Sequence, residues 1–216
     1  KLAALRLFID ISNLRPLLQE QELDPRGNLS EKELDEALLS RNILPEYVFD
    51  FLEKNETLAA KLQYFSVLLA QFYREEAKKH TGFLAKLFDF EREWRLVVLA
   101  IRAKAMGRDI VKELQFEDPL DPFVTQILVQ KDAAQYEPPA EYKELKELIQ
   151  SCGKDPLEQN KVIFSYRFHK IGELSSATQF SMDWILMYLA QLTIVEHWNE
   201  LDKARGKMIL DTFKTS

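Results

Sequence analysis

Glycine, proline and cysteine are scarce in this chain. Its 216 residues include only six Gly and eight Pro, which leaves little room for the turns of a β-sandwich or the glycine-rich loops of a nucleotide-binding fold. Cys152 is the single cysteine, so the chain cannot form an internal disulfide, and a cytosolic setting is the simplest interpretation. These shortages argue against sheet-rich, nucleotide-binding and disulfide-stapled classes of protein.

Long apolar runs and an excess of positive charge are also missing. The most apolar stretch, residues 184–195, contains Gln191 and Thr193 and is too short to span a membrane. The net charge of −6 argues against a general affinity for nucleic acid or anionic lipid. No signal peptide is visible, since Lys1 leads directly into amphipathic sequence, and the lack of an initiator Met leads us to expect native residues before Lys1.

The chain does contain apolar residues at helical spacing. Their recurrence every three or four positions predicts one helix over about 57–79 and a second over about 82–106, which Gly107 would end. Because the loop between them is short, we expect the two helices to form an antiparallel pair. The apolar faces that we predict for this pair are formed by Leu58, Leu62, Phe65, Leu69 and Phe72, and by Leu87, Phe90, Trp94, Val97 and Ile101.

Shorter helices are indicated by their terminal signals. Ser30 and Glu33 have the spacing of a capping box at the start of a helix. Pro45 favours the start of another helix that runs through Leu52. Residues 2–14 could form a helix or a strand, and we predict a helix.

Two proline-containing segments divide the chain. Residues 117–122 and 137–139 cannot be helix interior, because proline lacks the backbone donor and clashes with the preceding turn. We therefore predict an N-terminal helical lobe, residues 1–116, and a C-terminal helical lobe, residues 117–216, unless the two form one continuous domain.

The most apolar helix is predicted in the C-terminal lobe. Residues 181–198 are apolar around most of the circumference of a helix, which predicts a central buried helix. A last helix, packed on the surface, is predicted over residues 203–213.

A segment of eleven residues returns ninety positions later. Residues 90–100 read FEREWRLVVLA, and residues 180–190 read FSMDWILMYLA. Two interpretations stay open: one helical unit is used twice, or two amphipathic helices have similar apolar positions. The matched pairs are Phe90/Phe180, Trp94/Trp184, Leu96/Leu186, Leu99/Leu189 and Ala100/Ala190, together with the acidic pair Glu93/Asp183.

Motifs for phosphate or metal binding are missing. The chain has no phosphate-cradling glycine motif. The acids of residues 89–93 lie on a predicted long helix, but a di-iron bundle needs Glu-x-x-His pairs, which occur nowhere in the chain. Glu76 and His80 are four apart, and Glu196 adjoins His197, so neither pair supplies that motif. We predict no metal site and no cofactor.

Candidate catalytic residues have simpler structural interpretations. Lys154 could activate Cys152 as a thiolate, but a solvent-facing loop cysteine explains it as well. His169 could carry protons, but a structural histidine is the preferred interpretation. The carboxylates of Glu93 and Asp183 could be buried acids, but we expect each to pair with an arginine such as Arg92, Arg95 or Arg167. We predict no catalytic residue and no enzyme activity.

Two runs resemble one known family. Residues 88–110 and 164–213 are similar to helices of the C subunit of bacterial V-type (A/V-type) ATPases. The second run carries the more specific pattern, formed by Phe180, Asp183, Leu189, Ala190, Trp198, Leu201, Asp202, Gly206 and Lys207. The run from Phe8 to Leu18, with Asn13 and Leu14, is similar to the start of the family's helical region.

The resemblance implies a mechanical function. A C subunit is all-helical, is built from repeated helical units and has a cup or funnel shape. It couples the central shaft to the membrane rotor ring during ion or proton transport, and it hydrolyses nothing. The resemblance therefore implies protein partners, namely shaft and ring subunits, and a cytoplasmic location on the periphery of the membrane. The alternatives are a helical adaptor or regulator derived from such a subunit, and a helical enzyme with an unfamiliar site.

Overall fold

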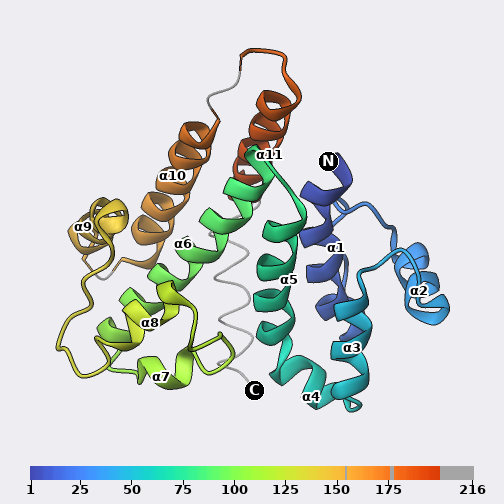
Figure 1. Ribbon diagram of the computed structural model, residues 1–216, viewed down its shortest axis with the longest axis horizontal. Helices are drawn as coiled ribbons and strands as arrows, with labels where there is room; N and C mark the ends of the chain where they lie inside the picture. Colours follow the sequence, from blue (N-terminus) through green and yellow to red (C-terminus); the bar gives the residue numbers. More distant parts are fainter. Residues whose placement is uncertain (154, 176–177, 200–216) are drawn as a thin grey trace, which may run out of the picture. The chain divides into compact units, whose positions relative to one another are not determined.

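The computed structural model describes residues 1–153, 155–175 and 178–199, drawn as coiled ribbons and loops in Figure 1. All regular secondary structure in these residues is helical, which confirms the predicted all-α class. The chain divides into two compact units, Lys1–Lys146 and Glu147–Ser216.

The first unit contains most of the helices. They are α1 (Leu2–Leu18), α2 (Glu31–Ser40), α3 (Glu46–Lys54), α4 (Leu58–Gln63), α5 (Phe65–Lys79), α6 (Phe83–Ala105), α7 (Ile110–Glu113), α8 (Pro122–Leu128), a 3₁₀ turn (Ala140–Tyr142) and the start of α9 (Lys143–Ser151). The second unit contains the end of α9, α10 (Pro156–Leu174) and α11 (Met182–Asn199).

The α5–α6 hairpin is the centre of the first unit, and Figure 1 shows its two helices side by side. Gly82 in the connecting loop has a φ of 69°, a conformation that glycine adopts without strain. Phe72 of α5 is fully buried, and its ring lies 5.4 Å from that of Phe88 on α6 and 5.5 Å from that of Phe8 on α1. These aromatic contacts join three helices in one apolar core.

Several predicted helix boundaries are confirmed. Ser30 and Glu33 form both hydrogen bonds of a capping box at the start of α2. Pro45 precedes α3, and α6 ends close to the predicted position. Gly107 has a φ of 66°, and the backbone N–H groups of Gly107 and Arg108 donate to carbonyls of the last turn of α6. Gly107 therefore ends α6 in a Schellman motif.

The single helix predicted over residues 57–79 is wrong, because the chain forms α4 and α5 there. Tyr64 separates them with φ −96° and ψ 12°, which is outside the helical region. The break removes the first part of the expected apolar face from the core: Leu58 is 51% exposed, whereas Phe65 and Phe72 of the same face are buried as predicted. Thr57 supplies a new helix start, since its hydroxyl accepts a hydrogen bond from the N–H of Ala60.

Two polar residues of α1 hold the loop that follows it. Asp10 is 2% exposed and accepts hydrogen bonds from the backbone N–H groups of Asn28 and Leu29 and from the Asn28 side chain. Asn13, also 2% exposed, exchanges two hydrogen bonds with the backbone of Asp24. We call these contacts the loop anchor, because they fix residues 19–30 against α1.

The first unit extends beyond the boundary expected after residue 116. Helix α8 packs against α6, and its Val124 and Ile127 are fully buried. Asp121 pairs with Arg92 of α6 at 2.6 Å. The proline-rich segment is therefore a turn within the first unit, and the chain divides after Lys146 instead.

The second unit is organised around the α10–α11 hairpin. Gly172 of α10 faces Gln191 of α11, and a Cβ at this glycine would lie 3.0 Å from the Gln191 side-chain nitrogen. That nitrogen donates a hydrogen bond to the carbonyl oxygen of Phe168. Glycine at position 172 thus lets the two helices approach closely. The helix predicted over residues 203–213 lies outside the described residues.

The predicted central burial of residues 181–198 is wrong. The helix exists as α11 and packs against α10, and within the part of the chain that the structure describes its buried residues are Leu186, Ala190 and Ile194. The helix with apolar residues buried on several sides is α6, because α5, α7 and α8 all pack against it.

Candidate functional site

The exposed face of α11 is apolar. Its side chains follow one another at spacings of three and four residues, so they form one line along the helix. We call this line the apolar stripe; its members and their exposed fractions are Met182 (54%), Ile185 (40%), Tyr188 (51%), Leu192 (37%) and Val195 (41%). No Asp, Glu, Lys or Arg occurs between Trp184 and Val195.

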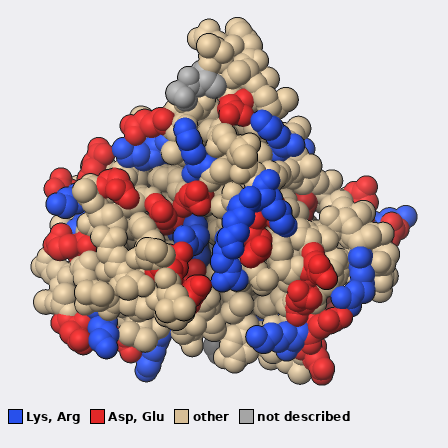
Figure 2. Space-filling view, in the orientation of Figure 1, with Lys and Arg blue, Asp and Glu red and all other residues tan. Residues whose placement is uncertain are grey.

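Aromatic rings stack at the start of the apolar stripe. The Trp184 ring lies parallel to that of Tyr188, with a centroid distance of 6.0 Å and an interplanar angle of 9°. Phe180, which is 81% exposed, places its ring 5.7 Å from Trp184. Figure 2 shows an uncharged surface at the tip of the α10–α11 hairpin, whereas charges of both signs are interspersed over much of the rest of this face. The stripe thus offers apolar and aromatic contacts with little charge.

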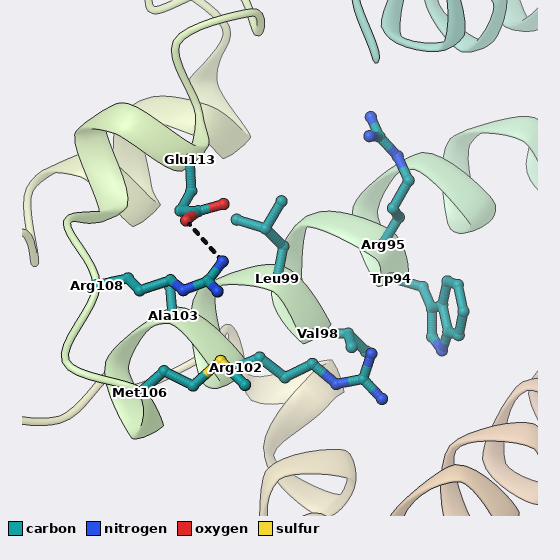
Figure 3. A pocket seen from close by; sticks show the side chains of 9 residues that line it. All are labelled: Trp94, Arg95, Val98, Leu99, Arg102, Ala103, Met106, Arg108 and Glu113. Atoms are coloured by element: carbon teal, nitrogen blue, oxygen red, sulfur yellow. Dashed lines mark hydrogen bonds and ion pairs between the residues drawn. The ribbon is translucent and has the colours of Figure 1, made fainter. Parts of the chain in front are cut away.

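A second candidate surface is a groove in the first unit, formed by α6, the turn at Gly107 and α7. Its volume is about 360 Å³, within the range of small binding pockets. Figure 3 shows its lining from close by. We call it the arginine groove; its lining residues are Trp94, Arg95, Val98, Leu99, Arg102, Ala103, Met106, Arg108 and Glu113.

Two arginines of the groove form ion pairs that differ in burial and length. Arg95 forms an ion pair of 2.6 Å with Glu117, whose side chain is only 8% exposed. Arg108 lies 3.4 Å from Glu113, and both side chains are accessible to solvent. An exposed ion pair of this length contributes little stability, so Arg108 can exchange Glu113 for another carboxylate at small cost.

Glu93 of α6 contacts the 3₁₀ turn. Glu93 accepts a hydrogen bond of 2.9 Å from the Tyr142 hydroxyl, and burial raises its pKa above the ordinary value despite that bond. Burial likewise raises the pKa of Asp89. At Asp121 the desolvation cost is outweighed by hydrogen bonds from Arg92 and the backbone, so its pKa lies below the ordinary value. A tyrosine, rather than the expected arginine, therefore donates the hydrogen bond to Glu93.

The remaining candidates lie apart from one another. Cys152 follows the end of α9, and its thiol donates to the Leu148 carbonyl at 3.2 Å; Lys154 lies outside the described residues. His169 is exposed on α10, and its Nδ1 lies 2.7 Å from the Ser165 carbonyl oxygen. Asp183 occupies the first turn of α11, where a carboxylate interacts favourably with the helix dipole.

Glu76 and His80, four positions apart on the chain, contact each other. Glu76 is 3% exposed and accepts hydrogen bonds from Tyr47 and Lys79, and the His80 Nε2 lies 3.3 Å from its carboxylate. This cluster joins α3 to α5. Among the residues that the structure describes, no group of three or more His, Cys, Asp or Glu side chains could hold a metal ion.

Sequence reasoning missed the arginine groove. Arg95, Val98, Arg102 and Met106 follow one another at helical spacing, so the signal was present on one face of α6. Spacing alone does not distinguish this face from an ordinary solvated face of an amphipathic helix. The described helices include none that is long and apolar enough to cross a bilayer.

The fold defines the class: an all-α protein built largely from helical hairpins. Within that class the chain belongs to the family described as "Protein of unknown function (DUF2764)", whose profile matches residues 1–216.

The relatives found by sequence are uncharacterized proteins of Chlamydia. One from Chlamydia trachomatis serovar D is 28% identical over 209 residues, which cover 93% of this chain and 79% of the relative. One from Chlamydia muridarum is 30% identical over 166 residues, 77% of this chain. That match spans only 62% of the Chlamydia muridarum protein. No solved structure matches this chain.

These findings correct the family assignment made from the sequence. The resemblance to the V-type ATPase C subunit rested on short apolar patterns in 88–110 and 164–213, whereas the DUF2764 profile matches the whole chain. Leu, Ala and aromatic residues at helical spacing occur in many packed helices, so the patterns were not specific enough to identify the C-subunit family.

Proposed function

We propose that this protein is a non-catalytic helical subunit that works by binding other proteins. The single observation that carries the proposal is the apolar stripe on α11. Five apolar side chains, each at least 37% exposed, follow one helix face, and no Asp, Glu, Lys or Arg occurs between Trp184 and Val195. Apolar surface gains roughly 25 cal/mol for each Å² removed from water, so a partner that covers this face gains free energy along its whole length.

The stripe also contains the residue types that dominate protein interfaces. Tyr188 and Trp184 are stacked, so little side-chain entropy remains to be lost when a partner binds them. Buried Tyr and Trp residues at the centre of an interface commonly contribute most of its affinity. The aromatic pair is therefore the expected centre of the contact.

A non-catalytic role is supported by the positions of the side chains that could act as acids, bases or nucleophiles. Glu93 and Asp89, whose pKa values are raised by burial, do not line the arginine groove. Cys152 and His169 have backbone carbonyls as their hydrogen-bond neighbours. A catalytic centre needs a nucleophile, a base and a substrate position within reach of one another, and these four groups do not supply that combination.

For the partners, we propose the central-shaft and rotor-ring subunits of a V-type rotary ATPase, with the protein as a cup-like coupling subunit on the cytoplasmic face of the membrane. The support is architectural: residues 90–100 lie in α6 and residues 182–190 in α11, the second helices of the hairpins α5–α6 and α10–α11. Repeated helical units are also the architecture that the resemblance to the C subunit implied. This proposal concerns function and does not restore membership in the C-subunit family.

The test is a pull-down of the tagged full-length protein from its native membranes, followed by mass spectrometry. Tyr188→Lys places a charge in the apolar stripe, and Leu120→Lys is the matched control, because Leu120 is 87% exposed and lies in the first unit. We expect shaft and ring subunits in fixed ratio with the wild type and the control, and at least about tenfold less with Tyr188→Lys.

Deletion of the gene gives a second measurement. Loss of ATP-driven ion pumping with retention of soluble ATPase activity is the result expected of a coupling subunit. Recovery of neither shaft nor ring, with the ATPase intact in the same extract, would replace the rotary-ATPase partners with those of a helical adaptor.

A further inference from the structure

Two large apolar side chains are exposed where α2 meets α3. Helix α2 lies at the edge of the first unit, where it packs against α1 (Figure 1). Leu39, in the last turn of α2, is 86% exposed, and Ile43, in the loop that follows, is 71% exposed. The next residue, Leu44, is buried, so the chain turns one apolar side chain into the core and presents the other to solvent. We call residues 39–43 the α2–α3 corner.

The backbone of the corner is strained at the residue that it presents. Ile43 has a φ of 67°, a conformation that is unfavourable for residues with a Cβ and most unfavourable for β-branched ones. The N–H of Leu44 donates to the carbonyl oxygen of Asn42 at 2.7 Å, which closes a γ-turn around Ile43, and a γ-turn with positive φ is rare and strained. Glycine or asparagine would relieve this strain, but the chain has an exposed isoleucine there. Backbone strain of this kind is concentrated at binding and switch sites.

The charged side chain of the corner is directed to α3. The Arg41 guanidinium pairs with Glu53 and lies over the Phe49 ring, 5.3 Å from the ring centroid. Arg41 therefore has partners within its own unit. The groups that the corner presents to a partner are the apolar side chains of Leu39 and Ile43, whose burial would gain free energy.

The helix that leads to the corner is strongly acidic. The ten residues of α2 contain four acids and one lysine, a net charge of −3, whereas the whole chain of 216 residues carries −6. Glu31 and Asp35 precede Leu39 at spacings of four residues, so the three exposed side chains follow one helix face. Within the part of the chain that the structure describes, neither Glu31 nor Asp35 has an ion-pair partner. Lys32 lies 3.7 Å from Glu36, so the lysine of α2 does not neutralise this face.

The charge of α2 selects the class of partner. A negative surface repels the phosphates of nucleic acids and of anionic lipids, which argues against those partners for the apolar side chains of the corner. A protein segment with Lys or Arg beside apolar side chains matches both features, because its cations attract the unpaired carboxylates and its apolar side chains cover the corner.

We infer that the α2–α3 corner binds a basic segment of another protein that carries apolar side chains among its cations. The apolar side chains of that segment cover Leu39 and Ile43, and its Lys or Arg side chains pair with Glu31 and Asp35. The inference goes beyond the proposed function, because it rests on residues of the first unit alone and holds whatever binds the apolar stripe.

The experiment is photo-crosslinking with the full-length protein. The crosslinking amino acid p-benzoylphenylalanine replaces Leu39, or Leu120 as a control that is equally exposed in the same unit. The purified protein is irradiated in an extract of its native cells, and the crosslinked peptides are sequenced by mass spectrometry. We expect the probe at position 39 to label one segment of another protein, with Lys or Arg beside apolar residues, and the probe at position 120 not to label it.

Charge reversal tests the recognition itself. The double variant Glu31→Lys/Asp35→Lys should reduce crosslinking at position 39 at least about tenfold. Its matched control, Glu144→Lys/Glu147→Lys, changes the net charge equally at two exposed acids of α9 that have no ion-pair partner among the described residues, and it should leave the yield unchanged. Changing the cations of the labelled segment to Glu should restore crosslinking to the Glu31→Lys/Asp35→Lys protein. Circular dichroism checks that both variants are folded.

The variant Ile43→Asn separates binding from stability. Asparagine adopts positive φ more readily than isoleucine, so the melting temperature should equal or exceed that of the wild type. The variant also removes an apolar contact, so crosslinking at position 39 should fall at least about tenfold. Leu120→Asn is the control and should leave the yield at position 39 unchanged.

Four results would overturn the inference. They are no protein segment at position 39, a labelled segment without basic residues, equal yields from the two double variants, or a yield that Ile43→Asn does not change. A lipid or nucleic-acid adduct at position 39 would replace the protein partner with that class of molecule. A lower melting temperature for Ile43→Asn would show that isoleucine stabilises the fold, and the interpretation of the strain would be wrong. A probe at Tyr188 reports the apolar stripe separately, so failure at one surface is not confused with failure at the other.

Discussion

Removal of the Asp10 carboxylate should release the loop that joins α1 to α2. The carboxylate is buried and accepts hydrogen bonds of 2.6 and 3.0 Å from the backbone N–H groups of Asn28 and Leu29, and one of 2.6 Å from the Asn28 side chain. Asp10→Ala leaves two backbone donors in a partly buried loop without their acceptor. Each such donor costs about 1–3 kcal/mol, and because this loop can partly rehydrate we expect a total loss of about 2–4 kcal/mol.

A second variant tests whether the same contact explains Gly27. A Cβ at Gly27 would lie 2.5 Å from the Asp10 Oδ1, which is closer than non-bonded atoms can approach. Gly27→Ala should therefore displace the carboxylate and cost about 1–3 kcal/mol. In the Asp10→Ala background that steric conflict is gone, so the added cost of Gly27→Ala should largely disappear. A double-mutant cycle measures this coupling.

Urea unfolding of the full-length protein gives the free energies, and tryptic cleavage after Arg26 under native conditions reports the loop directly. Cleavage should accelerate in Asp10→Ala, because residues 19–30 lose their anchor. Asp50→Ala on the exposed face of α3 is the control and should change stability by no more than about 0.5 kcal/mol. An Asp10→Ala protein as stable and as resistant to trypsin as this control would refute the loop anchor.

Three further predictions concern α6 and α11. Burial raises the pKa of Glu93 from its ordinary 4.5, so its contribution to stability is fully present below about pH 4.5 and is lost as the pH rises through the folded-state pKa. Glu93→Gln keeps a hydrogen-bond acceptor for Tyr142 and should raise the melting temperature at pH 7. The melting temperature of this variant should also change less between pH 4 and pH 7 than that of the wild type. A pH dependence of the melting temperature equal to that of the wild type would contradict this prediction. Leu186→Ala should cost about 2–5 kcal/mol in urea unfolding, because Leu186 is 1% exposed, whereas Tyr188→Lys on the opposite face should cost about 1 kcal/mol or less; equal costs would contradict the assigned faces. Trp94 and Trp184 are both half-buried, so each change to Ala should cost about 2–3 kcal/mol, less than the roughly 3–5 kcal/mol of a fully buried ring; a cost below about 1 kcal/mol at one site only would show that they are not equivalent.

Local signals in the sequence predicted much of the fold. The capping box at Ser30 and Glu33, the stop at Gly107 and the long helix α6 all depend on interactions within a few residues. Such interactions are determined by sequence neighbours, so spacing alone reveals them. The all-α class followed from the same signals.

Long-range contacts account for what the sequence did not predict. Asp10 meets Asn28 across 18 positions, and Arg95 meets Glu117 across 22. Neither pair follows from helical spacing. The exposure of Leu192 could not be predicted either, because an apolar helix face is buried only if a neighbour covers it. The sequence therefore predicted the apolar character of the stripe but not its exposure to solvent. It predicted none of the ion pairs around the groove.

The repeated segment connects the two surfaces. Burial supports the equivalence of the copies at two pairs: Leu96 and Leu186 are 0% and 1% exposed, and Ala100 and Ala190 are 0% and 8% exposed. It fails at the first pair, since Phe90 is buried in α6 whereas Phe180 precedes α11 and is exposed. With the same offset of ninety positions, the exposed face of α11 corresponds to the groove face of α6 through the pairs Ile185/Arg95, Tyr188/Val98 and Leu192/Arg102.

The two faces differ both in accessibility, since Tyr188 is 51% exposed and Val98 only 7%, and in chemistry. Two arginines of α6 stand where α11 has isoleucine and leucine. A cationic face discriminates among partners through charge, whereas an uncharged face binds through apolar area and aromatic contacts. One partner cannot match both faces equally well, because carboxylates that pair with arginine would have to be desolvated against the stripe without compensation. The two helix faces therefore differ in chemistry under either interpretation of the repeated segment, whether one helical unit is used twice or two amphipathic helices have similar apolar positions.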